Sequence, residues 1–162
     1  MDKILKLLQL INNNLKINCI LANQAGTRPN LPFITLQVLD EGGDIPTEST
    51  SKVMPNNMAE YTLKTKLESM IQFNCLGKNA QESVEVAKKL KNFFMFVSRQ
   101  ELWDNGIGVI DIGNIKDVTA LLEGVKYEHK RVLEVTIDYY DIAIKNIENM
   151  QSIEVNKEKI GR

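Results

Sequence analysis

The sequence has few of the residues that perform catalytic chemistry. Its 162 residues include one histidine, two cysteines and one tryptophan. His129 lies in a charged stretch without an evident nucleophile or acid partner, so we expect a neutral, solvent-exposed side chain. Cys19 and Cys75 are far apart and show neither C-x-x-C nor Cys/His spacing, which predicts two small buried side chains rather than a zinc or redox site.

Recognisable catalytic and metal-binding motifs are also missing. Gly106-Ile107-Gly108, the nearest imitation of a phosphate loop, opens a predicted strand instead of a helix. Acidic residues near Gly42-Gly43 depart from the calcium-loop spacing, and those at 138–141 alternate between the two faces of a strand. The sequence therefore predicts no catalytic residue, no metal and no cofactor, and hence no enzyme.

Neither charge nor hydropathy points to nucleic acid or membrane. Lysine and arginine total 20 against 21 acidic residues, whereas binding to a nucleic-acid backbone calls for a clustered positive surface. No apolar run approaches the roughly 20 residues that span a bilayer. The first residues carry an acid and interleaved lysines rather than a secretory leader, so we expect the protein in the cytoplasm where it is made.

What the sequence does contain is periodic hydrophobicity. Apolar spacing predicts a helix over residues 2–14, with Asp2 as a possible cap, and another from about 80 to 97, opened by Asn79 and Glu82. Alternation predicts strands at 17–21, after Pro32, at 60–76, at 107–115, and around 133–140. Residues 102–106 are expected to form a turn, and glycines within 107–115 suggest a bulge or a close backbone approach.

Two segments stand out by length. Residues 41–58 are polar and rich in Gly, Pro, Ser and Thr, which predicts a long mobile loop. The strand at 60–76 is two to three times the mean length, and we expect it to form a projecting hairpin arm with that loop at its tip.

These elements predict an α+β fold. We expect an antiparallel sheet of about four to five strands, with two helices packed on one face and the long hairpin arm. At this length one domain is expected, over residues 1–146, followed by a partly disordered extension at 147–162.

Three segments together resemble the neck and tail terminator family of tailed phages and phage-like particles. They are RPNLPFITLQVLDEGG, IQFNCLGKNAQESVEVAKKLKNFF and LWDNGIGVIDIGNIKDVTALLEGVKYEHKRVLEVTIDYYD. The marks are an R-P-x-x-P entry to a strand, a strand ending F-x-C-x-G-K, an L-W-D-x-G turn and an L-L pair before the last strand. The likeness runs from about residue 3 to 145 and is weakest in residues 41–58 and in the tail after Asn146, so no residue role is carried over to these two parts.

The resemblance implies a structural virion protein that assembles in the bacterial host cytoplasm and forms a homo-oligomeric ring, a hexamer in related terminators. The ring would lie at the head-proximal end of the tail, end polymerisation of the tube and possibly the sheath, and join the neck or head connector. DNA could pass through it without specific binding. The particle could be a phage, a prophage product or a bacteriocin-like derivative.

Residue roles follow from the matched motifs. Turn chemistry or core packing is implied for the matched positions, with core packing expected for Trp103 and Leu122. The matched positions are Arg28, Pro29, Pro32, Gly77, Trp103, Gly106 and Leu122. Candidate partner contacts, chosen from segment 41–58 and the wet face of the long strand, are Asp44, Ile45, Lys52, Lys64, Lys66 and Glu68. For these charged residues an ordinary solvated surface is the competing interpretation.

Two other functions remain open on the sequence. One is a head–tail connector or adaptor protein of the neck. The other is a small non-viral α+β domain that binds a ligand, for which a monomer with a deep polar cleft would be the signature.

Overall fold

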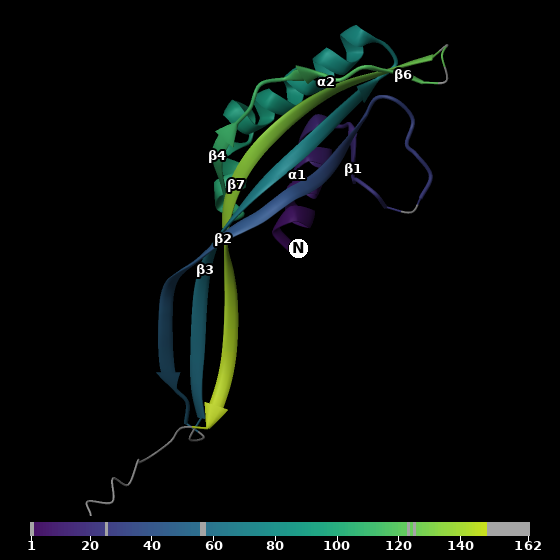
Figure 1. The fold of residues 1–162 in the computed structure, drawn as a ribbon. Coiled ribbons are helices and arrows are strands. Elements are labelled where there is room, and N and C mark those ends of the chain that lie inside the picture. Colours follow the sequence, from purple (N-terminus) through teal and green to yellow (C-terminus); the bar gives the residue numbers. More distant parts are fainter. Residues whose placement is uncertain (1, 25, 56–57, 123, 125, 149–162) are drawn as a thin grey trace, which may run out of the picture. The chain divides into compact units, whose positions relative to one another are not determined.

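The chain divides into two compact units in the computed structural model, which describes residues 2–24, 26–55, 58–122, 124 and 126–148. Unit 1 comprises Met1–Ile45 and Lys66–Tyr140, and unit 2 comprises Pro46–Thr65 and Asp141–Arg162. Three long strands contribute to both units (Figure 1). They are β2 (Phe33–Val53), β3 (Met58–Gly77) and β7 (Lys126–Glu148).

Helix α1 (Asp2–Leu15) begins unit 1 and confirms the predicted apolar stripe. Ile4, Leu7 and Ile11 are almost completely buried, because their spacing places them on one face of the helix. Lys16, with a φ of 55°, follows the helix in the left-handed region. The side chain of Asn12 then accepts a hydrogen bond from the Cys19 amide at 2.7 Å and donates one to the Cys19 carbonyl at 3.0 Å, which fixes the following strand beside the helix.

That strand, β1 (Asn18–Leu21), pairs in parallel with the start of β2. The register runs from Asn18 opposite Phe33 to Leu21 opposite Leu36. Between β1 and β2 the Leu31–Pro32 peptide bond is cis.

The second helical region is longer and less regular than the sequence predicts. Helix α2 (Ala80–Asn92) has the predicted cap, since the side chain of Asn79 accepts a hydrogen bond from the Glu82 amide at 2.8 Å. A π-helical turn, η1 (Phe93–Val97), and a short helix, α3 (Arg99–Asp104), follow. The predicted turn at 102–106 is therefore wrong for its first half, because α3 continues to Asp104 and only Asn105 and Gly106 lie between it and the next strand.

Three short strands follow one another along a single side of β7. Strand β4 (Ile107–Ile112) pairs with residues 135–139, β5 (Lys116–Asp117) with 131–132, and β6 (Ala120–Leu122) with 126–128. The register shifts between Val109 and Asp111, and the Gly113 amide donates to the Glu134 carbonyl at 2.8 Å. The bulge and the close backbone approach expected from the glycines are thus both present.

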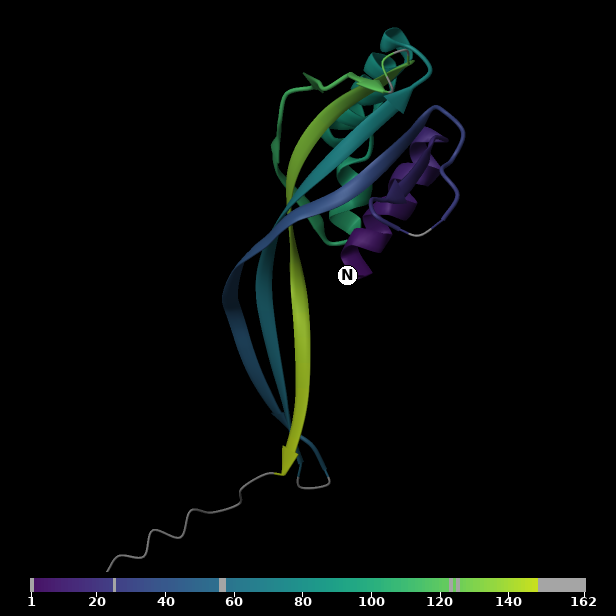
Figure 2. The ribbon, with the colours of Figure 1, turned by 45° about the vertical axis from the view of Figure 1, so that its right-hand side comes forward.

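The core of unit 1 lies between the sheet and the helices. Alternate residues of β2, β3 and β7 form one buried cluster with the inner faces of α1, α2, η1 and α3. Figure 2 shows these helices against this part of the sheet. Aromatic rings fill the centre: Phe73 of β3 lies 5.4 Å from Phe94, and Phe94 lies 5.1 Å from Phe93, measured between ring centroids. The predicted burial of Cys19 and Cys75 is confirmed.

Apart from Met54 and Pro55, the described residues of unit 2 are the remaining parts of the three long strands. β3 lies between β2 and β7 in the sheet, and Figure 1 shows the three strands side by side. The Met54 amide donates to the Met58 carbonyl at 2.8 Å, and the Thr47 hydroxyl donates to the Lys64 carbonyl at 3.0 Å. The prediction of a long loop at 41–58 is therefore wrong, because residues 41–53 belong to β2 and pairing with β3 holds them extended.

The predicted sheet is also wrong in size and type, although the broad α+β class agrees with the structure. In the described residues the sheet has seven strands rather than four to five. It is mixed, with a strand order of β1-β2-β3-β7-β4 and with β5 and β6 also paired to β7. One pair of its strands, β1 and β2, is parallel. The helices are also more than the two predicted, since η1 and α3 follow α2. The expected two-stranded hairpin arm is replaced by three strands, since β7 extends to Glu148 beside β3.

The proposed division between a domain at 1–146 and an extension at 147–162 stays a prediction. Residues 147 and 148 end β7, and the rest of the predicted extension lies outside the described residues.

Candidate interaction surfaces

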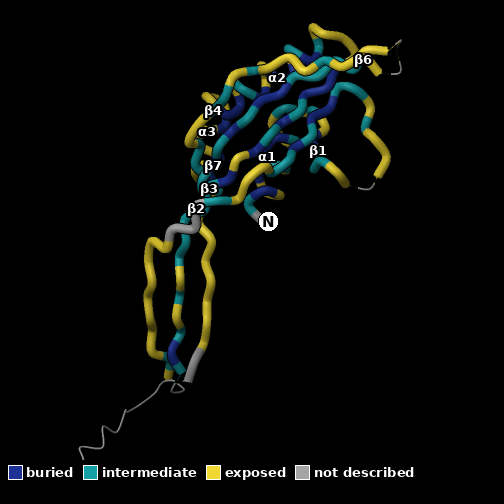
Figure 3. The backbone as a smooth tube through the Cα atoms, viewed as in Figure 1, coloured by how far each residue is buried: buried dark blue, intermediate teal, exposed yellow. Residues whose placement is uncertain are grey.

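The two outer strands of unit 2 are exposed along most of their described length. Every residue from Pro46 to Val53 in β2 and from Asp141 to Asn146 in β7 is exposed, whereas most of the intervening residues of β3 are half-buried (Figure 3). Among the described residues, β1 pairs with β2 only at 33–36, and β4, β5 and β6 pair with β7 only between 126 and 139. Within the described ranges, each side of unit 2 thus presents a strand edge with which no other strand pairs.

A second exposed surface follows η1 and α3 in unit 1. Met95, Phe96 and Val97 expose 51%, 86% and 66% of their surface, and Trp103 exposes 72%. The expected core position of Trp103 is therefore wrong. The reason is local: residues 99–104 are helical, so Leu102 turns inward and is fully buried while its neighbour Trp103 points outward. Exposed aromatic and aliphatic groups of this size are typical of contact surfaces.

The prediction of core packing is also wrong for Leu122. It is 40% exposed and its neighbour Leu121 is 53% exposed, because both lie on β6, a three-residue strand whose only described partner is β7.

Four of the seven matched positions nevertheless line one hollow of about 670 Å³ in unit 1. They are Arg28, Pro29, Gly77 and Leu122. At its edge the Arg28 guanidinium donates to the Glu128 carboxylate at 2.6 Å and lies 5.2 Å from the centre of the Phe33 ring. These contacts connect the segment before β2 to β7, which the sequence spacing could not indicate.

Two of the matched positions, Gly77 and Gly106, have backbone surroundings that favour glycine. A Cβ at Gly77 would lie 2.5 Å from the backbone nitrogen of Ser83, so the end of β3 can approach the first turn of α2 only without a side chain. Gly106 has a φ of +70°, which favours glycine and turns the chain from α3 into β4. Lys3 donates to the Asn105 carbonyl at 2.7 Å and attaches this turn to α1.

The candidate partner contacts are divided between the units. Asp44 and Ile45 lie in the unit 1 part of β2, and Lys52 and Lys64 belong to unit 2. Lys66 and Glu68 lie together in unit 1, 3.5 Å apart, and Lys66 also forms an ion pair with Asp138 at 3.0 Å. The hydrogen bond and charge of Asp138 raise the pKa of Lys66. Lys66 therefore has partners within the chain.

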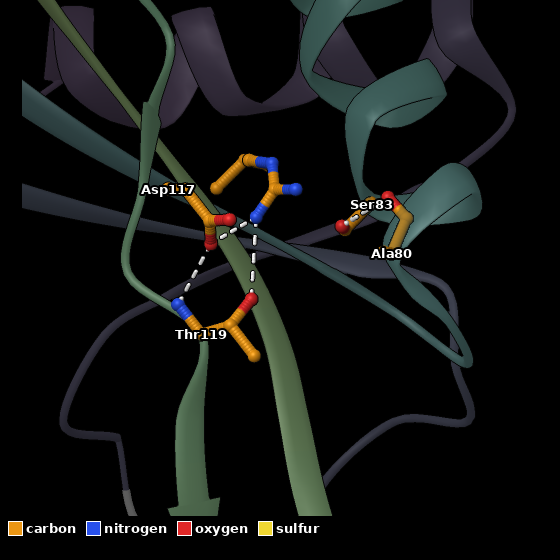
Figure 4. A network of polar contacts seen from close by, with 5 residues as sticks. Ala80, Ser83, Asp117 and Thr119 are labelled. Atoms are coloured by element: carbon orange, nitrogen blue, oxygen red, sulfur yellow. Dashed lines mark hydrogen bonds and ion pairs between the residues drawn. The ribbon is translucent and has the colours of Figure 1, made fainter.

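A further polar contact joins β5, the residues between β5 and β6, and β7. Arg131 forms an ion pair with Asp117 and donates to the Thr119 hydroxyl at 3.2 Å, and Figure 4 shows Asp117 and Thr119 at this contact. The Thr119 amide donates to Asp117 at 2.9 Å and, with the Thr119 side chain, lowers the pKa of that carboxyl. This contact fixes short strands that have little pairing of their own.

The expectation of an exposed His129 is wrong, since this residue is half-buried beside Tyr127, with the two ring centroids 6.3 Å apart. Within the described ranges, no group of three or more His, Cys, Asp or Glu side chains could hold a metal ion. Burial raises the pKa of each cysteine thiol to about 12, which suppresses the nucleophilic thiolate. The open strand edges of unit 2 and the exposed apolar side chains of η1 and α3 are the candidate surfaces for contact with other proteins.

The family comparison agrees with this interpretation. The model of the phage neck terminator protein family matches residues 2–161, and the chain belongs to this family. No curated protein matches the chain. No helix in the described part of the chain is long and apolar enough to cross a membrane. The protein is a structural component of the tail and neck region of a phage particle, where it contacts other tail or head proteins.

Proposed function

We propose that this protein forms a ring of identical copies at the head-proximal end of a phage or phage-like tail. The ring ends polymerisation of the tail tube, and of the sheath where one is present, and offers the surface to which the neck or head connector binds. The observation that carries this proposal is the family match over residues 2–161. The exposed strand edges of unit 2 support it, because a ring-forming subunit needs two different contact surfaces.

The physical requirement for a ring is a heterologous contact. When one surface of a copy binds a different surface of the next, the assembly closes if the rotation between copies is an integral fraction of a turn. A closed ring has no free lateral surface, so it cannot grow sideways. It can then bind end-on to a tube of matching symmetry, and this is how a small subunit without catalytic groups can stop a polymerisation.

Partner contacts on this account come from both units. We assign them to the residues selected from the sequence, namely Asp44, Ile45, Lys52, Lys64, Lys66 and Glu68, and add the exposed apolar side chains of η1 and α3. Phe96 and Trp103 are the strongest additions, because aromatic residues dominate the binding energy of protein interfaces and these two expose most of their surface.

The test is a deletion of the gene followed by electron microscopy of the particles. We expect tails that are overlong or not joined to heads, restored to normal by the wild-type gene in trans. A tagged copy should localise to the junction between head and tail. Normal, joined particles in the deletion strain, or a tag found elsewhere on the particle, would reject the proposal.

A further inference from the structure

The strand edges of unit 2 carry unused hydrogen-bonding capacity. In β2 the segment Pro46–Val53 pairs with β3 on one side, and in β7 the segment 141–148 does the same on the opposite side of β3. No other described strand pairs with either segment. Each edge is eight residues long, which exceeds the mean strand of 5 to 6 residues.

The chemistry of an open edge defines its occupant. A row of free backbone N–H and C=O groups is matched by another extended strand, which is why proteins that do not use such edges shorten, bulge or cover them. Here neither edge is short, and the described part of unit 2 contains no helix that could cover them. The edge of β2 contains Pro46 only at its start, so the remaining seven residues keep their N–H groups.

Strand direction then limits how copies can pair. Figure 1 shows that β2 and β7 run toward the same end of unit 2, while β3 runs the opposite way. A rotation about an axis along the strands keeps their direction, so the β7 edge of one copy meets the β2 edge of the next in parallel. Pairing of β2 with β2, or of β7 with β7, needs a two-fold axis, stops at two copies and leaves the other edge open.

We propose that residues 46–53 of one copy pair in parallel with residues 141–148 of the next copy, so that the unit 2 strands of all copies form one closed sheet. This inference rests on the proposed ring and adds which surfaces close it. This pairing uses both open edges of every copy, so a closed ring has no unpaired strand edge.

Single cysteines placed on the two edges test the pairing. Ser49→Cys and Ala143→Cys are at exposed positions of β2 and β7, and the native Cys19 and Cys75 are 2% and 0% exposed, so a maleimide cross-linker selects the new thiols. Full-length protein carrying each substitution is mixed at equal ratio, assembled and treated with a short bismaleimide. Particles from a strain that expresses both variants are treated in the same way.

We expect a cross-linked dimer in the mixture and none with either variant alone. The double variant should give a ladder of bands that ends at the number of copies in the ring. Lys88→Cys, at an exposed position on α2, is the matched control and should give no cross-link with either edge variant. Wild-type protein treated with the same cross-linker shows whether the native thiols react.

The outcomes separate the two proposals. A ring seen by microscopy without the mixed cross-link, or with cross-links in a single-variant sample, overturns the edge pairing and leaves the ring standing. Wild-type protein that forms no ring, either free or on particles, rejects the proposed function and this pairing with it.

Discussion

The same three strands have different surroundings in the two units of this protein. In unit 1, alternate residues of β3 from Ser69 to Cys75 are completely buried, because α1, α2 and η1 cover that face. In unit 2 the same strand buries only Ala59 among its described residues, and Tyr61 and Leu63 are 46% and 41% exposed. Alternation of side chains thus continues along the strand while its burial does not. Unit 1 has its own core, whereas the edges of unit 2 remain available to other chains.

The largest effect on stability is expected when one apolar side chain is removed from each unit and the two losses are compared. Phe73→Ala deletes a fully buried ring in contact with Phe94 and should lower the free energy of unfolding by about 3–5 kcal/mol. Leu63→Ala, in unit 2, should cost less, about 1 kcal/mol, because 41% of the residue is already exposed to water in the folded protein. Urea denaturation of the free protein measures both, and equal losses would contradict a core confined to unit 1.

The next effect concerns close packing at the end of β3. Gly77→Ala places a Cβ against the Ser83 backbone, which cannot move as a flexible side chain can, so we expect a loss of about 1–3 kcal/mol. Gly26→Ala is the control, since nothing lies within 4 Å of its added Cβ, and its stability should be unchanged. A Gly77 variant as stable as the Gly26 variant would show that β3 and α2 can move apart without any loss in the free energy of unfolding.

A smaller effect is expected at the polar contact between β5 and β7. The pKa of Asp117 in the folded protein lies below its ordinary value of 3.8, so its stabilising charge is present above that pH and is lost as pH falls through the lowered pKa. Asp117→Asn should lower the thermal midpoint slightly near neutral pH, and the difference from wild type should vanish in acid. Asp111→Asn, at an exposed position on β4, is the control. A difference that persists at the lowest pH would assign the effect to packing rather than to charge.

The smallest effect on stability should come from Trp103, although it is the largest side chain in the molecule. Trp103→Ser should change the free energy of unfolding by no more than about 0.5 kcal/mol because 72% of the residue is exposed. Incorporation into particles, measured by quantitative blotting, should fall if this surface contacts a partner. A strongly destabilised variant would place Trp103 in the folding core after all.

Local features of the fold could be predicted from the sequence. The spacing of Ile4, Leu7 and Ile11 indicated α1, and Asn79 with Glu82 marked the start of α2, since both signals depend on residues within one or two turns. The alternation in β3 and β7 identified two long strands for the same reason.

Features that depend on distant residues could not be predicted. The polar segment 41–53 has the composition of a loop, yet it is extended because it pairs with β3. Lys116–Asp117 and Ala120–Leu122 form strands only where β7 lies beside them. Trp103 was expected in the core because it matches the L-W-D-x-G motif of the family, while its exposure follows from the helical phase of α3. The open edges of unit 2 are a property of strand order, which no short sequence pattern encodes.

Hydrogen exchange of the free subunit and of the assembled particle tests most directly the claim that unit 2 is completed by neighbouring copies. We predict that the outward-facing amides within residues 47–53 and 141–148, which do not bond to β3, exchange rapidly in the free protein and become strongly protected after assembly. Amides of the unit 1 core, such as those of Phe73 and Val135, should be protected equally in both states. Equal exchange at the unit 2 edges before and after assembly would contradict the account.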